Sequence, residues 1–196
     1  MIERVMPARR TVLLSALALL GSLGPASEAQ AISLFDQQKY AAFVAEANTG
    51  EVLYSRRADT HRFPASITKV MTLYMVFEQL AAGQISLTDR VVMSRNAANQ
   101  RPSKLGLKAG ESLTVDQAIR SLATKSANDV SVALAEHIAG SSDEFARRMT
   151  VRARALGMSN SRFVNPNGLP DSRQVTTARD IFILSQATIR DFPQYY

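Results

Sequence analysis

The sequence predicts a mixed α/β (α+β) fold in which an antiparallel sheet lies beside an α-helical lobe. Two patterns predict it: a hairpin pattern over residues 40–56, and a series of capped helices that begins near Ser66. With 196 residues, the chain can bury the core of one domain without disulfides. It has no cysteine, which excludes a disulfide framework, a thiolate nucleophile and a Cys-ligated zinc site.

A β-hairpin is predicted at the start of this domain. Two short apolar runs, residues 40–47 and 51–56, are separated by Asn48-Thr49-Gly50, in which the glycine can supply the positive φ of a tight turn. An isolated two-stranded hairpin is marginal in water. We therefore expect further strands or a helix to cover it.

A long, largely buried helix is expected from near Ser66, with Gly83 as its left-handed C-cap. Pro64 disfavours helix at the residue before it, so Ser66 lies at a loop-to-helix junction. The apolar residues of this helix recur every three or four residues: Val70, Leu73, Tyr74, Phe77 and Leu80. After the helix, a short strand or extended connector (87–92) and a loop-like segment (94–110) are expected.

Four further helices are predicted, each with a residue at its start that can cap it. Thr114 and Gln117 have the capping-box form, and Asn128 can cap the helix after the next break. Ser141 begins the third helix, and Thr177 begins the last. The expected spans are about 114–123, 129–138, 141–156 and 178–189, with a compact turn at 165–170.

Residues 1–31 have the pattern of a secretory signal peptide. Three arginines precede the apolar run 11–20, which is too short to span a bilayer, and Ala29-Gln30-Ala31 supplies an A-x-A cleavage pattern. The sequence therefore predicts export, with residues 32–196 as the mature portion. The Arg9-Arg10 pair leaves a twin-arginine route open beside the ordinary one.

The composition limits the possible partners. The net charge is +6, but the basic residues are scattered rather than gathered on one helix or interleaved with aromatics, so no nucleic-acid partner is predicted. His61 and His137 are the only histidines, too few for a His-rich metal cage, and we expect neither a metal nor a cofactor. No stretch after residue 31 approaches eighteen consecutive apolar residues, so no membrane span is predicted.

Ser66-Ile67-Thr68-Lys69 is the chain's only S-x-x-K tetrapeptide. Positions i and i+3 share one face of a helix, so the lysine can reach the serine hydroxyl and act as its base. A lysine of ordinary pKa is neutral in only about one molecule in two thousand at pH 7. The motif therefore requires a cleft that lowers this pKa, and the N-terminal end of a helix would also stabilise an oxyanion there.

A second candidate element is Ser126-Ala127-Asn128, which places a hydroxyl and a carboxamide two residues apart between helices. The 57 residues that separate Lys69 from Ser126 are enough to return the chain to the same cleft. Lys125 would add local positive charge. Asn128 can also be read as a plain helix N-cap, and the two roles are compatible.

Four segments in this order resemble the low-molecular-mass penicillin-binding proteins of the D-alanyl-D-alanine carboxypeptidase family, serine peptidase family S11. They are Ser66–Lys69, Leu107–Glu111, Ser126–Asp129 and Phe163–Leu169, and the hairpin around residues 45–54 is also similar. The resemblance extends from about Gln38 to the end. It implies a β-lactamase/transpeptidase-like fold and a location in the periplasm, either free or at the outer face of the cytoplasmic membrane.

The resemblance also implies a mechanism and site residues. Ser66 would attack the carbonyl between the two terminal D-alanines of a peptidoglycan stem peptide, and water would hydrolyse the acyl-enzyme. β-Lactam antibiotics would acylate the same serine. Lys69 would be the general base, Ser126 would relay the proton to the leaving amine, and Asn128 would bind the substrate peptide. The Ser66 backbone N–H would form half of an oxyanion hole.

One family motif does not occur. Family members carry Lys-Thr-Gly on a cleft strand well downstream of the Asn128 position, and this tripeptide is absent from the sequence. We therefore expect a C-terminally truncated chain with an incomplete sheet, in which the hairpin exposes an unpaired edge and an apolar face.

Three readings of function follow. The chain, or its full-length parent, is a serine-type D-Ala-D-Ala carboxypeptidase; or it is a truncated or pseudoenzyme chain that at most binds muropeptide or wall partners. A class A β-lactamase is the third, but the sequence has no recognisable Glu-x-x-x-Asn loop. The choice between carboxypeptidase and endopeptidase depends on loop shape, which the sequence leaves open.

Overall fold

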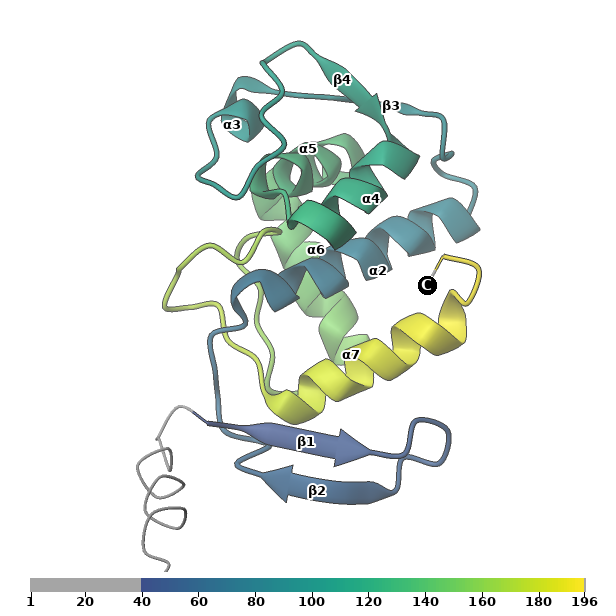
Figure 1. Cartoon of the computed structure of the whole chain (residues 1–196), viewed down its shortest axis with the longest axis vertical. Helices are drawn as coiled ribbons and strands as arrows, with labels where there is room; N and C mark the ends of the chain where they lie inside the picture. The colour runs from purple at the N-terminus through teal and green to yellow at the C-terminus, as the bar shows by residue number, and fades with distance from the viewer. Residues whose placement is uncertain (1–39, 196) are drawn as a thin grey trace, which may run out of the picture. The chain divides into compact units, whose positions relative to one another are not determined.

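The computed structural model describes residues 40–195. The predicted signal peptide, residues 1–31, lies outside the described residues. The described part contains four short strands in two antiparallel pairs, six α-helices and one 3-10 turn (Figure 1). The predicted mixed α/β fold is confirmed.

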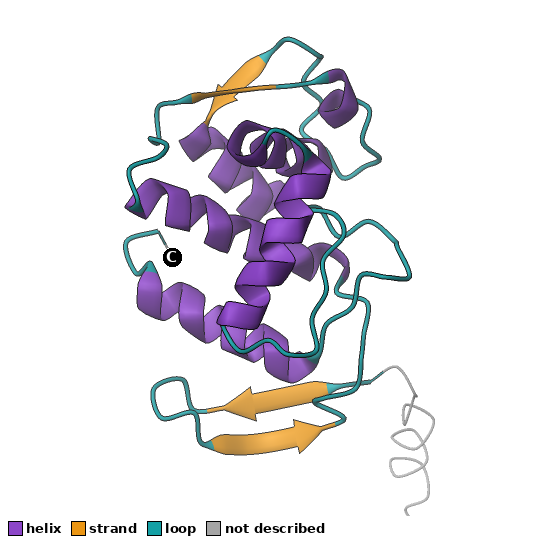
Figure 2. Cartoon of the chain, turned by 180° about the vertical axis from the view of Figure 1, so that it is seen from behind, coloured by secondary structure: helices purple, strands orange, loops and turns teal. Residues whose placement is uncertain are grey.

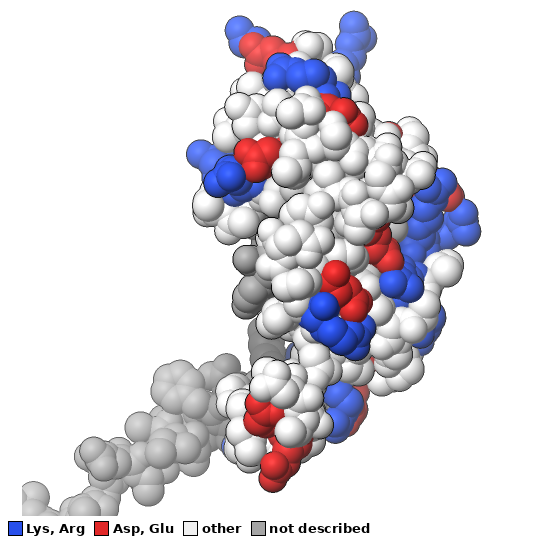
Figure 3. Space-filling view, turned by 90° about the vertical axis from the view of Figure 1, so that its right-hand side faces the viewer, with Lys and Arg blue, Asp and Glu red and all other residues white. Residues whose placement is uncertain are grey.

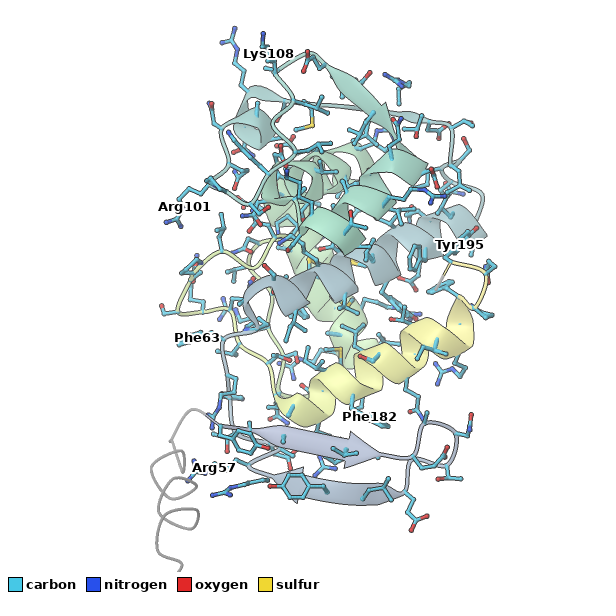
Figure 4. All side chains as sticks on the ribbon, in the orientation of Figure 1. Arg57, Phe63, Arg101, Lys108, Phe182 and Tyr195 are labelled. Atoms are coloured by element: carbon cyan, nitrogen blue, oxygen red, sulfur yellow. The ribbon has the colours of Figure 1, made fainter. Side chains whose placement is uncertain are left out.

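The predicted hairpin is confirmed, and one helix covers it. Strand β1 (Ala42–Ala45) pairs with β2 (Val52–Arg56). Helix α7 (Ala178–Asp191) runs along β1. The rings of Phe43 and Phe182 meet edge to face at 5.2 Å between centroids, which favours this packing. Phe182 lies on the side of α7 that faces the hairpin (Figure 4).

The other side of the hairpin is uncovered. Strand β2 is exposed along its whole length, and Val52, Leu53 and Tyr54 are 49%, 64% and 45% exposed. Within residues 40–195, β2 pairs with no strand other than β1. The expected unpaired edge and apolar face are therefore confirmed for this part of the chain.

The serine segment is a 3-10 turn followed by an α-helix, where the sequence predicted one helix. The turn η1 spans Ala65–Ile67, and α2 spans Thr68–Ala81. Helix α2 then ends at the expected place, with Gly83 at a φ of +65°. It runs through the middle of the lobe and contacts α4, α5, α6 and α7 (Figures 1 and 2).

The segment predicted to be a loop, residues 94–110, contains structure that the sequence did not reveal. Helix α3 (Arg95–Ala98) begins at Ser94, whose hydroxyl accepts a hydrogen bond from the Ala97 N–H. Strand β4 (Ser112–Thr114), just beyond the segment, pairs with β3 (Arg90–Val92). Elements of three or four residues are too short to show a hydrophobic period, which explains both omissions.

Three helices form the rest of the lobe, and two of the predicted caps here are confirmed. Thr114 and Gln117 form a reciprocal capping box, and the Ser141 hydroxyl accepts from the Glu144 N–H. The helices are α4 (Val115–Lys125), α5 (Asn128–Ala139) and α6 (Ser142–Ala155).

The prediction that Asn128 caps α5 is wrong. Ala127 occupies the N-cap position, and Asn128 is the first residue of the helix. Its side chain makes no cap bond, because it turns toward Lys69 and the Arg101 carbonyl instead.

Two apolar clusters on opposite sides of α2 hold the lobe together. One joins α2 to α6 and α7 through Met71, Phe145 and Leu184, all fully buried. The other joins α2 to α4 and α5 and includes Val76 and Val130. Because α2 contributes to both clusters, its first turn has a fixed position relative to α5.

A polar cluster adds to the contacts among α2, α6 and α7. The Tyr74 hydroxyl donates to Asp191 Oδ2 at 2.9 Å, and Arg152 lies 2.6 Å from Glu78 Oε1. Arg152 also donates to the Tyr74 hydroxyl at 3.0 Å. Burial and then the bond to Asp191 raise the pKa of Tyr74, so its hydroxyl stays protonated and can donate.

The surface carries interspersed charges. On the face in Figure 3, acidic and basic side chains lie next to one another between larger neutral areas. Arg147 pairs with Glu144, and Arg173 pairs with Asp171, in both cases a few residues apart. Such exposed pairs contribute little to stability. In residues 40–195, no helix has both the length and the apolarity that crossing a membrane requires.

Candidate active site

Ser66 lies in the middle of η1 and is exposed. The strand-like residue Arg62 exchanges two backbone hydrogen bonds with Thr176, at 2.7 and 2.9 Å, which fixes the approach to the turn. Ala65, just before the serine, has a φ of +46°, a region that non-glycine residues rarely adopt. Strain of this kind persists only where surrounding structure enforces it, and it often marks a functional site.

Lys69 brings its amine next to Ser66, as the i, i+3 spacing predicted. The Nζ atom lies 3.4 Å from Ser66 Oγ, 2.8 Å from Asn128 Oδ1 and 2.6 Å from the Asn167 carbonyl oxygen. The side chain is 3% exposed. The amine is therefore held by three oxygens, all from uncharged groups.

Burial lowers the pKa of Lys69 from 10.5 to about 8. The pKa falls because burial removes water from around the ammonium, which disfavours the charged form. The buried environment that the S-x-x-K motif requires around its lysine is therefore present. At a pKa near 8, about one lysine in ten is neutral at pH 7 and can accept a proton.

Asn128 contacts Lys69 and the loop before β4 at the same time. Its Oδ1 accepts from Lys69, and its Nδ2 donates to the Arg101 carbonyl at 2.9 Å. The residue is 4% exposed. The structure thus brings Ser66, Lys69 and Asn128 together from segments about sixty residues apart.

Ser126 is close to this group along the chain but makes none of its hydrogen bonds. It is half-buried and adopts the left-handed conformation that ends α4, with a φ of 56°. Across residues 40–195, its hydroxyl has no hydrogen-bond partner. The hydroxyl is therefore available to another group.

The carbonyl of Asn167 is a site group that the sequence reasoning missed. Residues 163–169 were matched to the family as a segment, but no residue in them was assigned a role. A backbone carbonyl leaves no signal in a sequence because every residue carries one. Asn167 is 3% exposed, and its side chain donates to Gln100 Oε1 at 3.1 Å.

Gly168 brings the same loop against the serine turn. A Cβ atom at this position would lie 1.8 Å from the Ala65 carbonyl oxygen and 3.0 Å from the Ser66 backbone nitrogen. Its φ is +84°. Glycine is therefore required twice here, by its backbone conformation and by the close approach.

An apolar depression of about 380 Å³ borders the serine turn. Ala65, Gly168, Phe63 and Leu169 are among the residues that line it. Phe63 is 70% exposed at the edge of the molecule (Figure 4). The surface beside the serine turn on this side is therefore mainly apolar.

The sequence of this chain matches the family model for D-alanyl-D-alanine carboxypeptidase, peptidase family S11, over residues 27–196. The chain belongs to this family. The D-alanyl-D-alanine carboxypeptidase DacF of Bacillus subtilis is 38% identical over 149 residues, and DacA of Escherichia coli is 39% identical over 155. Each alignment covers 76% of this chain but only 38% of the relative, so the chain spans well under half of their length.

Solved structures of the family have the same fold over most of this chain. The D-alanyl-D-alanine carboxypeptidase DacD of Francisella tularensis superposes with a TM-score of 0.79 at 37% identity, over 82% of this chain and 39% of that one. Penicillin-binding protein D2 of Listeria monocytogenes, in its ampicillin-bound form, gives 0.70 at 29% identity, over 79% and 63%. The predicted family and fold are thus confirmed.

In this member of the D-alanyl-D-alanine carboxypeptidase family, the site offers an exposed hydroxyl, a buried amine of lowered pKa and a carboxamide that orients the amine. A weakly basic amine beside a hydroxyl can take its proton as the oxygen attacks a carbonyl. Within residues 40–195, no group of three or more His, Cys, Asp or Glu side chains is arranged to hold a metal ion.

Proposed function

We propose that this protein acts as a serine-type D-Ala-D-Ala carboxypeptidase and removes the terminal D-alanine from peptidoglycan stem peptides. Ser66 attacks the carbonyl between the two D-alanines and forms an ester, D-alanine leaves with a proton on its amine, and water then hydrolyses the ester. The observation that carries the proposal is the buried Lys69 amine 3.4 Å from Ser66 Oγ.

The roles of the site residues belong to the same proposal. Lys69 takes the Ser66 proton, because burial keeps a useful fraction of its amine neutral. Ser126 relays the proton toward the leaving amine, which its unbonded hydroxyl allows. Asn128 binds the substrate peptide group, and it also orients Lys69 through the 2.8 Å contact.

The substrate and the inhibitors follow from the reaction. A β-lactam ring presents a strained amide to the same hydroxyl and would leave a stable acyl-enzyme on Ser66. The ampicillin-bound relative supports this class of ligand. We propose stem peptides ending in D-Ala-D-Ala as substrates and β-lactams as inhibitors.

The direct test exposes the purified protein to a fluorescent penicillin. We expect covalent label on the natural sequence and none on Ser66→Ala, because the ester needs the serine oxygen. A matched control is Ser55→Ala on the exposed strand β2, which should label normally. Label that persists on Ser66→Ala would refute Ser66 as the nucleophile.

A second function is kept beside this one, in which the site binds its ligand without turnover. In that reading the chain binds muropeptide or wall partners without turnover. A folded protein that takes no label and releases no D-alanine from a D-Ala-D-Ala peptide would support it. Release of D-alanine, lost in Ser66→Ala, would exclude it.

We also propose that the protein is exported to the periplasm, on the basis of the signal pattern in residues 1–31. Expression of the whole chain, followed by fractionation, should give a product shortened at Ala31 in the periplasmic fraction. A full-length product confined to the cytosol would contradict export.

A further inference from the structure

Two buried hydroxyls from different helices donate to one carbonyl oxygen. Thr72 Oγ1 on α2 and Ser131 Oγ on α5 each lie 2.6 Å from the oxygen of Pro166. Both residues are 0% exposed. A carbonyl has two lone pairs, so the two donors satisfy it fully.

These hydroxyls differ from most other helical hydroxyls in the described part of the chain. A serine or threonine in a helix can donate to a carbonyl three or four residues back in its own helix. Five such residues do so within residues 40–195: Ser121 to Ala118, Thr124 to Arg120, Thr150 to Ala146, Ser185 to Ile181 and Thr188 to Leu184. Thr150 Oγ1 also lies 3.1 Å from the Phe163 carbonyl oxygen. Thr72 and Ser131 instead reach 94 and 35 residues along the chain, to the same atom.

The atom that they hold is one peptide unit from the candidate active site. The next carbonyl, that of Asn167, accepts from Lys69 Nζ at 2.6 Å. Because peptide units are planar and of fixed length, a restraint on the Pro166 carbonyl limits where the Asn167 carbonyl can lie. The next residue, Gly168, then packs against Ala65 in the serine turn.

The start of this loop is held by a different side chain, that of Gln174. Gln174, 2% exposed, accepts from the Val164 and Asn165 backbone N–H groups at 2.9 and 3.0 Å. It also donates to Thr68 Oγ1 at 3.2 Å. The two hydroxyls therefore hold the middle of the loop, where Lys69 and Gln100 also contact Asn167, rather than its start.

We propose that Thr72 and Ser131 are positioning residues, which hold the loop at residues 165–168 against α2 and α5 and so keep the Asn167 carbonyl on the Lys69 amine. The pair acts through the loop: both hydroxyls donate to Pro166, and in residues 40–195 neither hydrogen-bonds to Ser66 or Lys69. The contribution to catalysis rests on the proposed function. The contribution to the environment of Lys69 does not.

A physical consequence follows for Lys69. The groups that contact its amine are Ser66, Asn128 and Asn167, all uncharged, and burial is the cause of its lowered pKa. Asp129, the next residue on α5, directs its carboxylate to the Leu105 and Gly106 N–H groups. If the loop is released, water reaches the amine and its pKa rises toward the ordinary value.

The test measures that titration directly. Protein labelled with ¹³C at the lysine ε carbon is titrated by NMR, and the Lys69 signal is assigned by its absence in Lys69→Met. We expect a midpoint near pH 8 in the natural sequence. In the double variant Thr72→Val/Ser131→Ala, it should rise by about one pH unit or more.

Matched variants separate positioning from a general loss of packing. Thr188→Val/Ser121→Ala removes two buried hydroxyls of the same kinds that bond within their own helices, and the Lys69 midpoint should stay unchanged. Thr72→Ser/Ser131→Thr keeps both hydroxyls and should retain the original midpoint. If the double variant does not fold, Ser131→Ala alone should give a smaller rise in the same direction.

The outcomes are distinct. The proposal is overturned if the Lys69 midpoint is unchanged in folded Thr72→Val/Ser131→Ala. If the double variant does not fold, an unchanged midpoint in folded Ser131→Ala overturns it. Penicillin labelling of the same variants reports on catalysis, and we expect a larger slowing at pH 7 than at pH 10. If the natural sequence takes no label at all, the proposed function fails while the NMR result still decides the positioning role.

Discussion

Replacing Lys69 by methionine is expected to slow the acylation of Ser66 by a fluorescent penicillin by about 10²–10⁴-fold, the range that a lost general base produces. Methionine keeps the length and apolar packing of the buried stem but cannot accept a proton. The measurement is the rate of covalent labelling at saturating penicillin, taken on protein shown to be folded by circular dichroism.

The pH dependence should identify the base. Lys69 acts when it is neutral, so the labelling rate should rise with pH through the lowered pKa near 8 and level off above it. An unburied lysine would instead give a rise near pH 10.4. The slow residual labelling of Lys69→Met should lack the step near pH 8.

Two further variants sharpen this result. Lys69→Arg keeps the positive charge but cannot lose its proton at these pH values, so it should be as slow as Lys69→Met. Lys108→Met removes an exposed lysine on the loop before β4 and should leave the rate unchanged (Figure 4). If Lys69→Arg labelled at the natural rate, a role for Lys69 as base would have to be abandoned.

Gly168→Ala should lower the free energy of unfolding by several kcal/mol, more than any other Gly→Ala change in residues 40–195. The new methyl carbon would lie 1.8 Å from the Ala65 carbonyl oxygen, a backbone atom, so the loop or the serine turn must move. The positive φ adds about 1–2 kcal/mol. Urea denaturation followed by circular dichroism gives the difference.

Gly157→Ala is the matched control. Gly157 also has a positive φ, +92°, but a Cβ atom there would meet no atom within 4 Å. Its cost should therefore be only the conformational part, about 1–2 kcal/mol. Equal losses in the two variants would show that the contact with Ala65 is not maintained in solution. Gly168→Ala should also slow penicillin labelling, because the displaced turn carries Ser66.

Much of the fold could be predicted from local patterns. The capping box at Thr114 and the caps at Ser141 and Thr177 open helices where the sequence placed them. The failures are also local in origin. Helix α3 and strand β4 are too short to show a period, and Asn128 has cap chemistry but uses its side chain elsewhere.

The candidate site also has one part that the sequence predicted and another part that it did not. The sequence alone determined that Ser66 and Lys69 lie one helical turn apart, because that distance depends only on spacing within a continuous turn and helix. It also identified the family, because four motifs occur in a fixed order. These are properties of neighbouring residues and of order along the chain.

Only the tertiary structure decided what surrounds the amine. The contacts of Lys69 with Asn128 and Asn167 span 59 and 98 residues, and the bond from Thr72 to Pro166 spans 94. Two of these partners are backbone carbonyls, which no residue type distinguishes. Burial, which lowers the pKa of Lys69, arises when α2, α5 and the loop at residues 165–168 close around it, so it depends on packing that no local pattern encodes.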